Sequence, residues 1–162
     1  MPPRKPKKRT PGGRAKTKPI PQPRRFQPGH KMPDGTIYAG VSPHTGAAMY
    51  VTPSDTPLPL PFDHARQYAA DLEAHSHRDW RLPTKDELNV IFGNREAIGG
   101  FNLTGLGPAG SAYWSSSQKS KFDACSQRFR DGTQFWEYTG FHSNVRCVRA
   151  ALSFELLLAK SS

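Results

Sequence analysis

Residues 79–92 constrain the fold more than any other stretch, because they join a rigid proline to a capped helix start and an apolar stripe. Thr84 and Glu87 have the spacing of a capping box, in which each side chain accepts a hydrogen bond from a backbone N–H that the helix leaves unpaired. Apolar side chains then recur at helical spacing, at Leu88, Ile91 and Phe92. The pattern predicts a helix over 85–98 that buries this face, with Trp80 as an aromatic anchor of the core.

Helical and strand patterns follow one another in an order typical of an α+β protein. A run with apolar residues three or four apart predicts a first helix at 62–74. Strands are predicted at 36–41, 48–52, 112–117, 124–130, 134–138 and 145–149. The first two strands are expected to form a hairpin, and the last four are expected to form an antiparallel meander.

The whole chain carries a net charge of +10, and this positive charge is concentrated in residues 1–31. This segment holds 11 of the 23 Lys and Arg residues, none of the 13 acidic residues and eight of the 16 prolines, so the remainder is close to neutral. A segment of this composition cannot bury a core and is expected to be an extended or disordered arm. The sequence therefore predicts a basic arm at 1–31, a folded domain at 32–150 and an apolar extension at 151–162.

Two interpretations of the arm stay open: a solvated linker, or a segment that docks on an acidic protein surface or on nucleic acid. The docking residues would be Arg4, Lys5, Lys7, Lys8, Arg9, Arg24, Arg25 and Phe26. Nucleic-acid modules interleave several stacking aromatic residues with their charges, whereas Phe26 is the only aromatic residue of the arm. Sequence-specific recognition of nucleic acid is therefore not expected.

Membrane and export signals are not found in the sequence. No apolar run is long enough to span a bilayer, and no apolar core of a signal peptide follows the basic start. We therefore expect no membrane span and a location in the cytoplasm or on a virion. The apolar residues of 152–159 are expected to pack on the domain or on a second copy in a homo-oligomer.

Signatures of enzymes are also missing, since the chain has neither a Gly-x-x-x-x-Gly-Lys loop nor a Gly-x-Ser-x-Gly elbow. The serines of 115–117 have no identifiable base, and the histidines of 64–77 are spaced like solvent-exposed residues rather than metal ligands. We expect no catalytic residue, no cofactor and no metal. Cys125 and Cys147 are too few for a disulfide framework, and whether they pair or remain free thiols stays open.

Four motifs occur in a fixed order: Trp-Arg-Leu-Pro-Thr-Lys-Asp-Glu-Leu at 80–88, Tyr-Trp-Ser-Ser-Ser at 113–117, Arg-Phe-Arg-Asp-Gly at 128–132 and Val-Arg-Cys-Val-Arg at 145–149. This series resembles the domain-of-unknown-function-1566 group, also called the C-terminal domain of Legionella collagen-like protein, over about residues 34–149. The resemblance implies a C-type-lectin-like fold, with two helices packed on a small twisted antiparallel sheet. The group includes variable proteins diversified by retroelements, whose ligand-contacting stretch corresponds to 118–144 here.

Aromatic and charged side chains are dense in 118–144, and Trp, Tyr and Arg are the residue types that dominate binding hot spots. The predicted ligand-binding residues are Lys119, Lys121, Phe122, Asp123, Ser126, Arg130, Phe135, Trp136, Glu137, Tyr138, Phe141 and His142. The favoured hypothesis is a non-enzymatic recognition protein that binds a protein or cell-surface ligand through this stretch. Two alternatives stay open: a structural protein of a phage particle or bacterial complex, docked by its arm, and a nucleic-acid-associated protein that acts through the arm.

Overall fold

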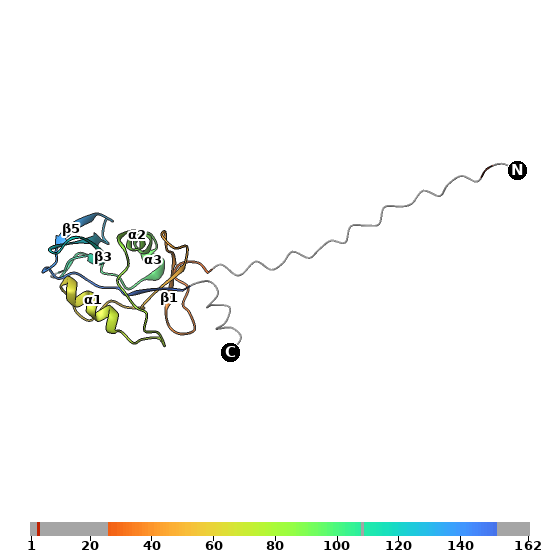
Figure 1. The fold of residues 1–162 in the computed structure, drawn as a ribbon, viewed down its shortest axis with the longest axis horizontal. Coiled ribbons are helices and arrows are strands. Elements are labelled where there is room, and N and C mark those ends of the chain that lie inside the picture. The colour runs from red at the N-terminus through yellow and green to blue at the C-terminus, as the bar shows by residue number, and fades with distance from the viewer. Residues whose placement is uncertain (1–2, 4–25, 108, 152–162) are drawn as a thin grey trace.

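Three helices and two three-stranded antiparallel sheets form an α+β fold over residues 3, 26–107 and 109–151, the part of the chain that the computed structural model describes. The elements are β1 (Ile37–Val41), β2 (Ala48–Val51), α1 (Phe62–Asp71), α2 (Lys85–Gly93), α3 (Arg95–Ile98), β3 (Ala112–Ser120), β4 (Asp123–Arg128), β5 (Gln134–Tyr138) and β6 (Val148–Ala151). The α+β class expected from the sequence is confirmed. The two sheets lie toward opposite ends of the domain, with α2 and α3 on one side and α1 on the other (Figure 1).

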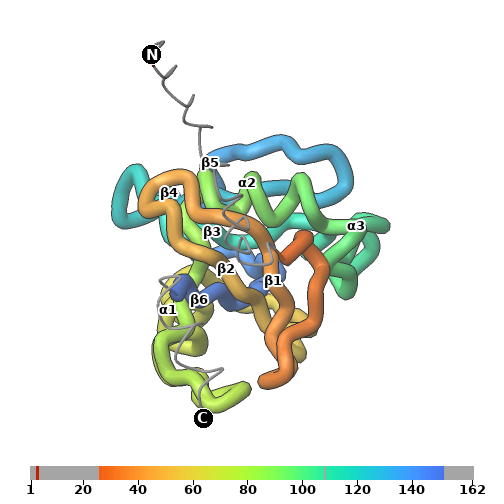
Figure 2. Tube along the Cα trace, turned by 90° about the vertical axis from the view of Figure 1, so that its right-hand side faces the viewer, coloured from red at the N-terminus to blue at the C-terminus, as the bar shows by residue number. Residues whose placement is uncertain are grey.

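The last strand joins the first sheet, so the predicted four-stranded meander is wrong in its final member. β6 pairs with β2, which lies between β1 and β6 (Figure 2), and the meander consists of β3, β4 and β5. Residues 145–147 do not belong to a strand because they bond the loop after β2. Thr56 N donates to Val145 O at 3.0 Å, and Thr52 N donates to Cys147 O at 3.2 Å.

The helix predicted over 85–98 is divided at Asn94, whose backbone leaves helical geometry at φ −104° and ψ 11°. The side-chain amide of Asn94 donates to the carbonyl of Ala39 in β1 at 3.1 Å, so a contact between distant parts of the chain holds the break. The first helix also ends earlier than predicted, at Asp71. Leu72 has extended backbone geometry, at φ −68° and ψ 119°, and the backbone of residues 74–77 then closes a tight turn.

Two apolar clusters make up the core. The first contains residues of α2 and of the β1-β2-β6 sheet, together with Tyr113 of β3 and Phe129, which directly follows β4. The second contains residues of α1 and surrounds Trp114 of β3. Trp80 belongs to this second cluster, where it is 3% exposed and its Nε1 donates to Ala74 O at 3.1 Å, so its role as a core anchor is confirmed.

The described residues that precede β1 run along the first sheet. Residues 26–31, grouped with the arm in the sequence analysis, bond β1: Tyr38 N donates to His30 O at 2.9 Å, and the ring of Phe26 stacks on His30 at 4.6 Å. The other seven docking residues predicted in the arm, and the extension from 152 on, lie outside the described residues. Within the described residues, no helix has the length and apolar character needed to cross a membrane.

The predicted capping box is confirmed, and one of its members does more than cap. Glu87 N donates to Thr84 Oγ1 at 3.2 Å, and Thr84 N donates to Glu87 Oε2 at 3.0 Å. The Glu87 side chain is only 2% exposed. Its carboxylate also accepts two bonds from Arg81, at 2.7 and 3.0 Å, and one from Ser42 Oγ at 2.8 Å, which ties the end of β1 to α2. Burial opposes ionisation, but these donors outweigh it and lower the pKa of Glu87 to about 2.

We expect Glu87→Gln to lower the free energy of unfolding by about 3 kcal/mol at neutral pH, because an amide cannot accept all of these hydrogen bonds. The folded-state pKa of Glu87 lies below the ordinary value of 4.5, so this stabilisation is complete above about pH 4.5 and is lost as the pH falls toward 2. Urea unfolding curves of the two proteins should therefore differ at neutral pH and converge in acid.

The matched control is Asp86→Asn on the same helix turn, where the side chain is 46% exposed and pairs with His44 and Lys85. Surface pairs of this kind contribute less than about 1 kcal/mol. A Glu87→Gln protein as stable as the control at neutral pH would contradict the role assigned to Glu87.

Candidate functional site

The serine run of β3 serves the fold. Lys85 N, at the start of α2, donates to Ser117 Oγ at 3.0 Å, and Ser116 N donates to Pro83 O at 2.7 Å. Ser115 Oγ donates to Cys125 O at 2.7 Å, and the pairing of β3 with β4 shifts register across this run. The bulge therefore holds β3 against the beginning of α2, and the hydroxyls of Ser115 and Ser117 are occupied by structural bonds.

The arginines of the Val-Arg-Cys-Val-Arg motif are also used inside the domain. Arg146 is 1% exposed; its Nε donates to Asp55 Oδ1 at 2.7 Å, and its guanidinium lies 4.0 Å from the centroid of the Phe101 ring. The Tyr113 hydroxyl donates to the other oxygen of Asp55 at 2.5 Å. Burial raises the pKa of Asp55 despite the opposing effect of Arg146. Arg149 donates twice to the carboxylate of Asp79, at 2.8 and 3.1 Å.

Several exposed rings belong to β5 and to the turns beside it. β5 lies at the end of the domain on the left of Figure 1. Trp136 is 46% exposed, and Tyr138 is 52% exposed; as alternate residues of β5 they share one side of the strand. Phe122 and Phe141 are each 58% exposed, and Thr139 N donates to Phe122 O at 2.9 Å, which places the turn before β4 beside the end of β5.

Two lysines lie against these rings. Lys119 Nζ is 6.0 Å from the centroid of the Trp136 ring, and Lys121 Nζ is 5.6 Å from that of Phe122, so both distances fall within the range of cation–π attraction. The rings of Tyr138 and Phe141 meet edge to face at 5.6 Å. We call this set the aromatic face; its members are Lys119, Lys121, Phe122, Trp136, Tyr138 and Phe141. It presents apolar area and positive charge together.

The other side of β5 faces inward and supports the fold. Glu137 is half-buried, and its carboxylate accepts hydrogen bonds from Ser126 Oγ at 2.7 Å and Ser143 Oγ at 2.9 Å. Ser126 is fully buried, so it lies beneath the surface rather than on it. Phe135 is half-buried under Arg128, whose guanidinium carbon is 5.4 Å from the ring centroid.

Three further predicted ligand-binding residues do not belong to the aromatic face. Arg130 lies at the opposite end of β4 from these rings. It is exposed beside Gly105, and its backbone N–H donates to Ser111 Oγ at 3.4 Å. Asp123 accepts a hydrogen bond from Ser120 Oγ at 2.6 Å. His142 lines an apolar hollow of about 410 Å³ near the start of α1, together with Leu58, Pro59, Leu60, Pro61 and His64. The structure thus gathers half of the predicted ligand-binding residues into the aromatic face.

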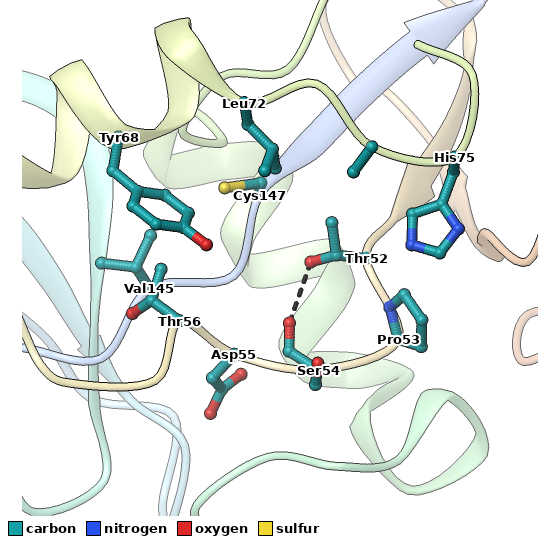
Figure 3. A pocket seen from close by; sticks show the side chains of 11 residues that line it. Thr52, Pro53, Ser54, Asp55, Thr56, Tyr68, Leu72, His75, Val145 and Cys147 are labelled. Carbon is teal, nitrogen blue, oxygen red and sulfur yellow. Dashed lines mark hydrogen bonds between the residues drawn. The ribbon is translucent and has the colours of Figure 1, made fainter. Parts of the chain in front are cut away.

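A smaller cavity of about 170 Å³ lies between α1, the loop after β2 and the segment before β6 (Figure 3). Tyr68, Thr52 and Cys147 are among its lining residues, and Thr52 Oγ1 donates to Ser54 O at 3.0 Å. His75 also lines it; the Nδ1 of His75 lies 2.9 Å from Asp34 O and must carry the proton, because a carbonyl can only accept. Among the described residues, no group of three or more His, Cys, Asp or Glu could hold a metal ion.

The two cysteines are free and buried. Burial raises the pKa of Cys147 to about 12 and also raises the pKa of Cys125, so both are protonated thiols at neutral pH. We expect neither to react with an aromatic disulfide reagent in the folded protein and both to react after unfolding in guanidinium without reductant. Thiols that stay unreactive after unfolding would instead indicate a disulfide.

Trp136→Ala and Tyr138→Ala are expected to change the free energy of unfolding by less than about 1 kcal/mol, because both rings are half in solvent. Trp114→Ala is the matched comparison; it empties a site that is 1% exposed and should cost about 3–5 kcal/mol. Denaturant unfolding measures all three. A large loss of stability in either β5 variant would show that these rings support the core.

Comparison with known proteins gives one result. No curated protein matches the chain. A family model described as the Lcl C-terminal domain matches residues 36–149, a stretch that runs from β1 into β6 and contains the capping box, the serine bulge, the aromatic face and both paired arginines. The chain therefore belongs to the Lcl C-terminal domain family.

Proposed function

We propose that this protein is a non-enzymatic recognition protein that binds a protein or cell-surface ligand through the aromatic face. The observation that carries the proposal is the exposure of four large rings, Phe122, Trp136, Tyr138 and Phe141, at one end of a well-packed domain. Exposing apolar rings in this way is unfavourable in water unless a partner covers them, and contiguous exposed apolar area usually marks an interaction site. Membership of the Lcl C-terminal domain family is compatible with a surface or adhesion role.

The proposal extends to a C-type-lectin-like frame with a variable surface, as in the retroelement-diversified proteins that the sequence resembles. The support for this extension is that the side chains of residues 118–144 divide into an inward set and an outward set. Inward residues such as Ser126 and Glu137 make side-chain bonds that hold the sheet, whereas outward residues such as Trp136 and Phe122 contact the flexible ends of lysines. Outward positions can therefore change without loss of the fold. A neighbouring reverse-transcriptase gene with a template repeat confined to such positions would support diversification.

The alternative, a structural protein docked by its basic arm, is compatible with recognition at the other end. β5 lies at one end of the domain, and the first described residues of the continuous chain run beside β1 at the other (Figure 1). A partner of the arm and a ligand of the aromatic face could therefore bind without competing. Under this alternative the arm directs incorporation of the protein into an assembly, and the aromatic face binds no ligand.

The test is binding of the labelled full chain to whole cells and to an array of extracellular protein domains. Trp136→Ala and Tyr138→Ala should each weaken binding by on the order of 2 kcal/mol, since exposed Trp and Tyr at a binding centre are typical hot spots. Leu106→Ala is the control, because Leu106 is 75% exposed but lies outside the aromatic face. Binding that survives both ring variants and is lost on deletion of 1–31 would favour the docked structural protein instead.

A further inference from the structure

Three of the four sheet edges are covered by other segments. Residues 29–31 run beside β1, and Arg81 bonds Val148 at the outer edge of β6. Asn144 covers β3: Trp114 N donates to Asn144 O at 3.1 Å, and Asn144 N donates to Ala112 O at 2.9 Å. Folded proteins generally protect sheet edges in this way, because a bare edge offers unpaired N–H and C=O groups to any other strand.

The fourth edge, that of β5, is not covered by any segment that the structure describes. Arg128 N donates to Thr133 O, and Thr139 N donates to Phe122 O, both at 2.9 Å, so the odd-numbered residues of 133–139 face β4. Because pairing alternates along an antiparallel ladder, the backbone groups of Gln134, Trp136 and Tyr138 point away from the sheet. Tyr138 O accepts from Phe141 N at 3.0 Å; across the described residues, the backbone groups of Gln134 and Trp136 and the N–H of Tyr138 have no hydrogen-bond partner.

We propose that the open edge of β5 binds an extended peptide segment of a partner protein, which adds to the β3-β4-β5 sheet as a fourth strand. This inference rests on the proposed function and specifies how the ligand is held. Backbone hydrogen bonds to Gln134, Trp136 and Tyr138 would supply a general affinity for extended chain. Side chains of the peptide opposite Trp136 and Tyr138 would lie on the aromatic face, since paired residues share a side of the sheet.

Charge favours a peptide that carries carboxylates. The cations of the aromatic face, Lys119 and Lys121, are exposed, whereas the nearby acids Asp123 and Glu137 are half-buried, and Glu137 lies on the other side of β5. An acidic side chain beside the rings would therefore meet two lysines opposed by the single carboxylate of Asp123. A second copy of this chain is a poorer occupant of the edge, because it would bring the same two lysines.

The decisive comparison is Trp136→Pro with Trp136→Ala. Proline removes the outward N–H as well as the ring, and it is tolerated on an edge strand where that N–H faces solvent. Alanine removes the ring alone. Phe135→Pro is the folding control, since the backbone of Phe135 faces β4 and its substitution should break the ladder. Circular dichroism and urea unfolding check that the first two variants remain folded.

The probe is a displayed library of random peptides of about ten residues, the length of a long strand. Selection on the full chain should enrich peptides with acidic and apolar residues. Trp136→Ala should weaken the best of them, and Trp136→Pro should weaken it about tenfold further, because a backbone hydrogen bond is lost as well. The same peptide with N-methyl groups on the amides that pair with β5 should lose binding, and methylation of the alternate amides should not.

The outcomes separate this inference from the proposed function. Equal affinities for the Pro and Ala variants, with no effect of N-methylation, would overturn strand addition and leave recognition by the rings intact. No enrichment, or affinities unchanged in both variants, would overturn strand addition, and the binding test with cells and extracellular domains would then decide the proposed function separately. If the protein is a dimer in sedimentation equilibrium and Trp136→Pro dissociates it, the occupant of the β5 edge is a second copy of the chain, and the peptide proposal is overturned.

Discussion

The buried carboxylate of Glu87 is the interaction on which the arrangement of the elements depends. It receives hydrogen bonds from Ser42 at the end of β1, from Arg81 before α2 and from the backbone of Thr84 at the helix start. One ionised group thus fixes the first sheet relative to the helix. The serine bulge of β3 in turn packs against the beginning of that helix, where Lys85 N donates to Ser117 Oγ. The second sheet, with the aromatic face at its far end, is positioned through this chain of contacts.

Local signals predicted the parts of the fold that short stretches determine. The capping box needs only Thr84 and Glu87, and both of its hydrogen bonds are present. The strand at 134–138 has the bounds predicted for it, and Trp80 is buried as its place before a helix start indicates. In each case the residues that decide the outcome lie within a few positions of one another.

Contacts between distant residues decided what the sequence could not show. The segment 145–147 looks like a strand, but its carbonyls are taken by Thr52 and Thr56 from the far half of the chain. The break at Asn94 depends on the carbonyl of Ala39, and the burial of Glu87 depends on Ser42. For the candidate site, composition indicated a stretch dense in aromatic and charged residues but not the side on which each residue lies. Ser126 is hidden because it lies on β4, the central strand of its sheet, on the same side as the inward Phe135.

The confinement of open backbone to β5 has a consequence for how far strand addition can propagate. Within the described residues, a segment that pairs with β5 takes the one sheet edge that no other segment covers. Two copies that paired through β5 would form a continuous sheet whose outer strands are both β3, and the edge of β3 is bonded by Asn144. Growth into a fibril needs a second open edge on every copy. β5 can thus remain available to a foreign segment, while self-association of folded copies through this edge stops at two.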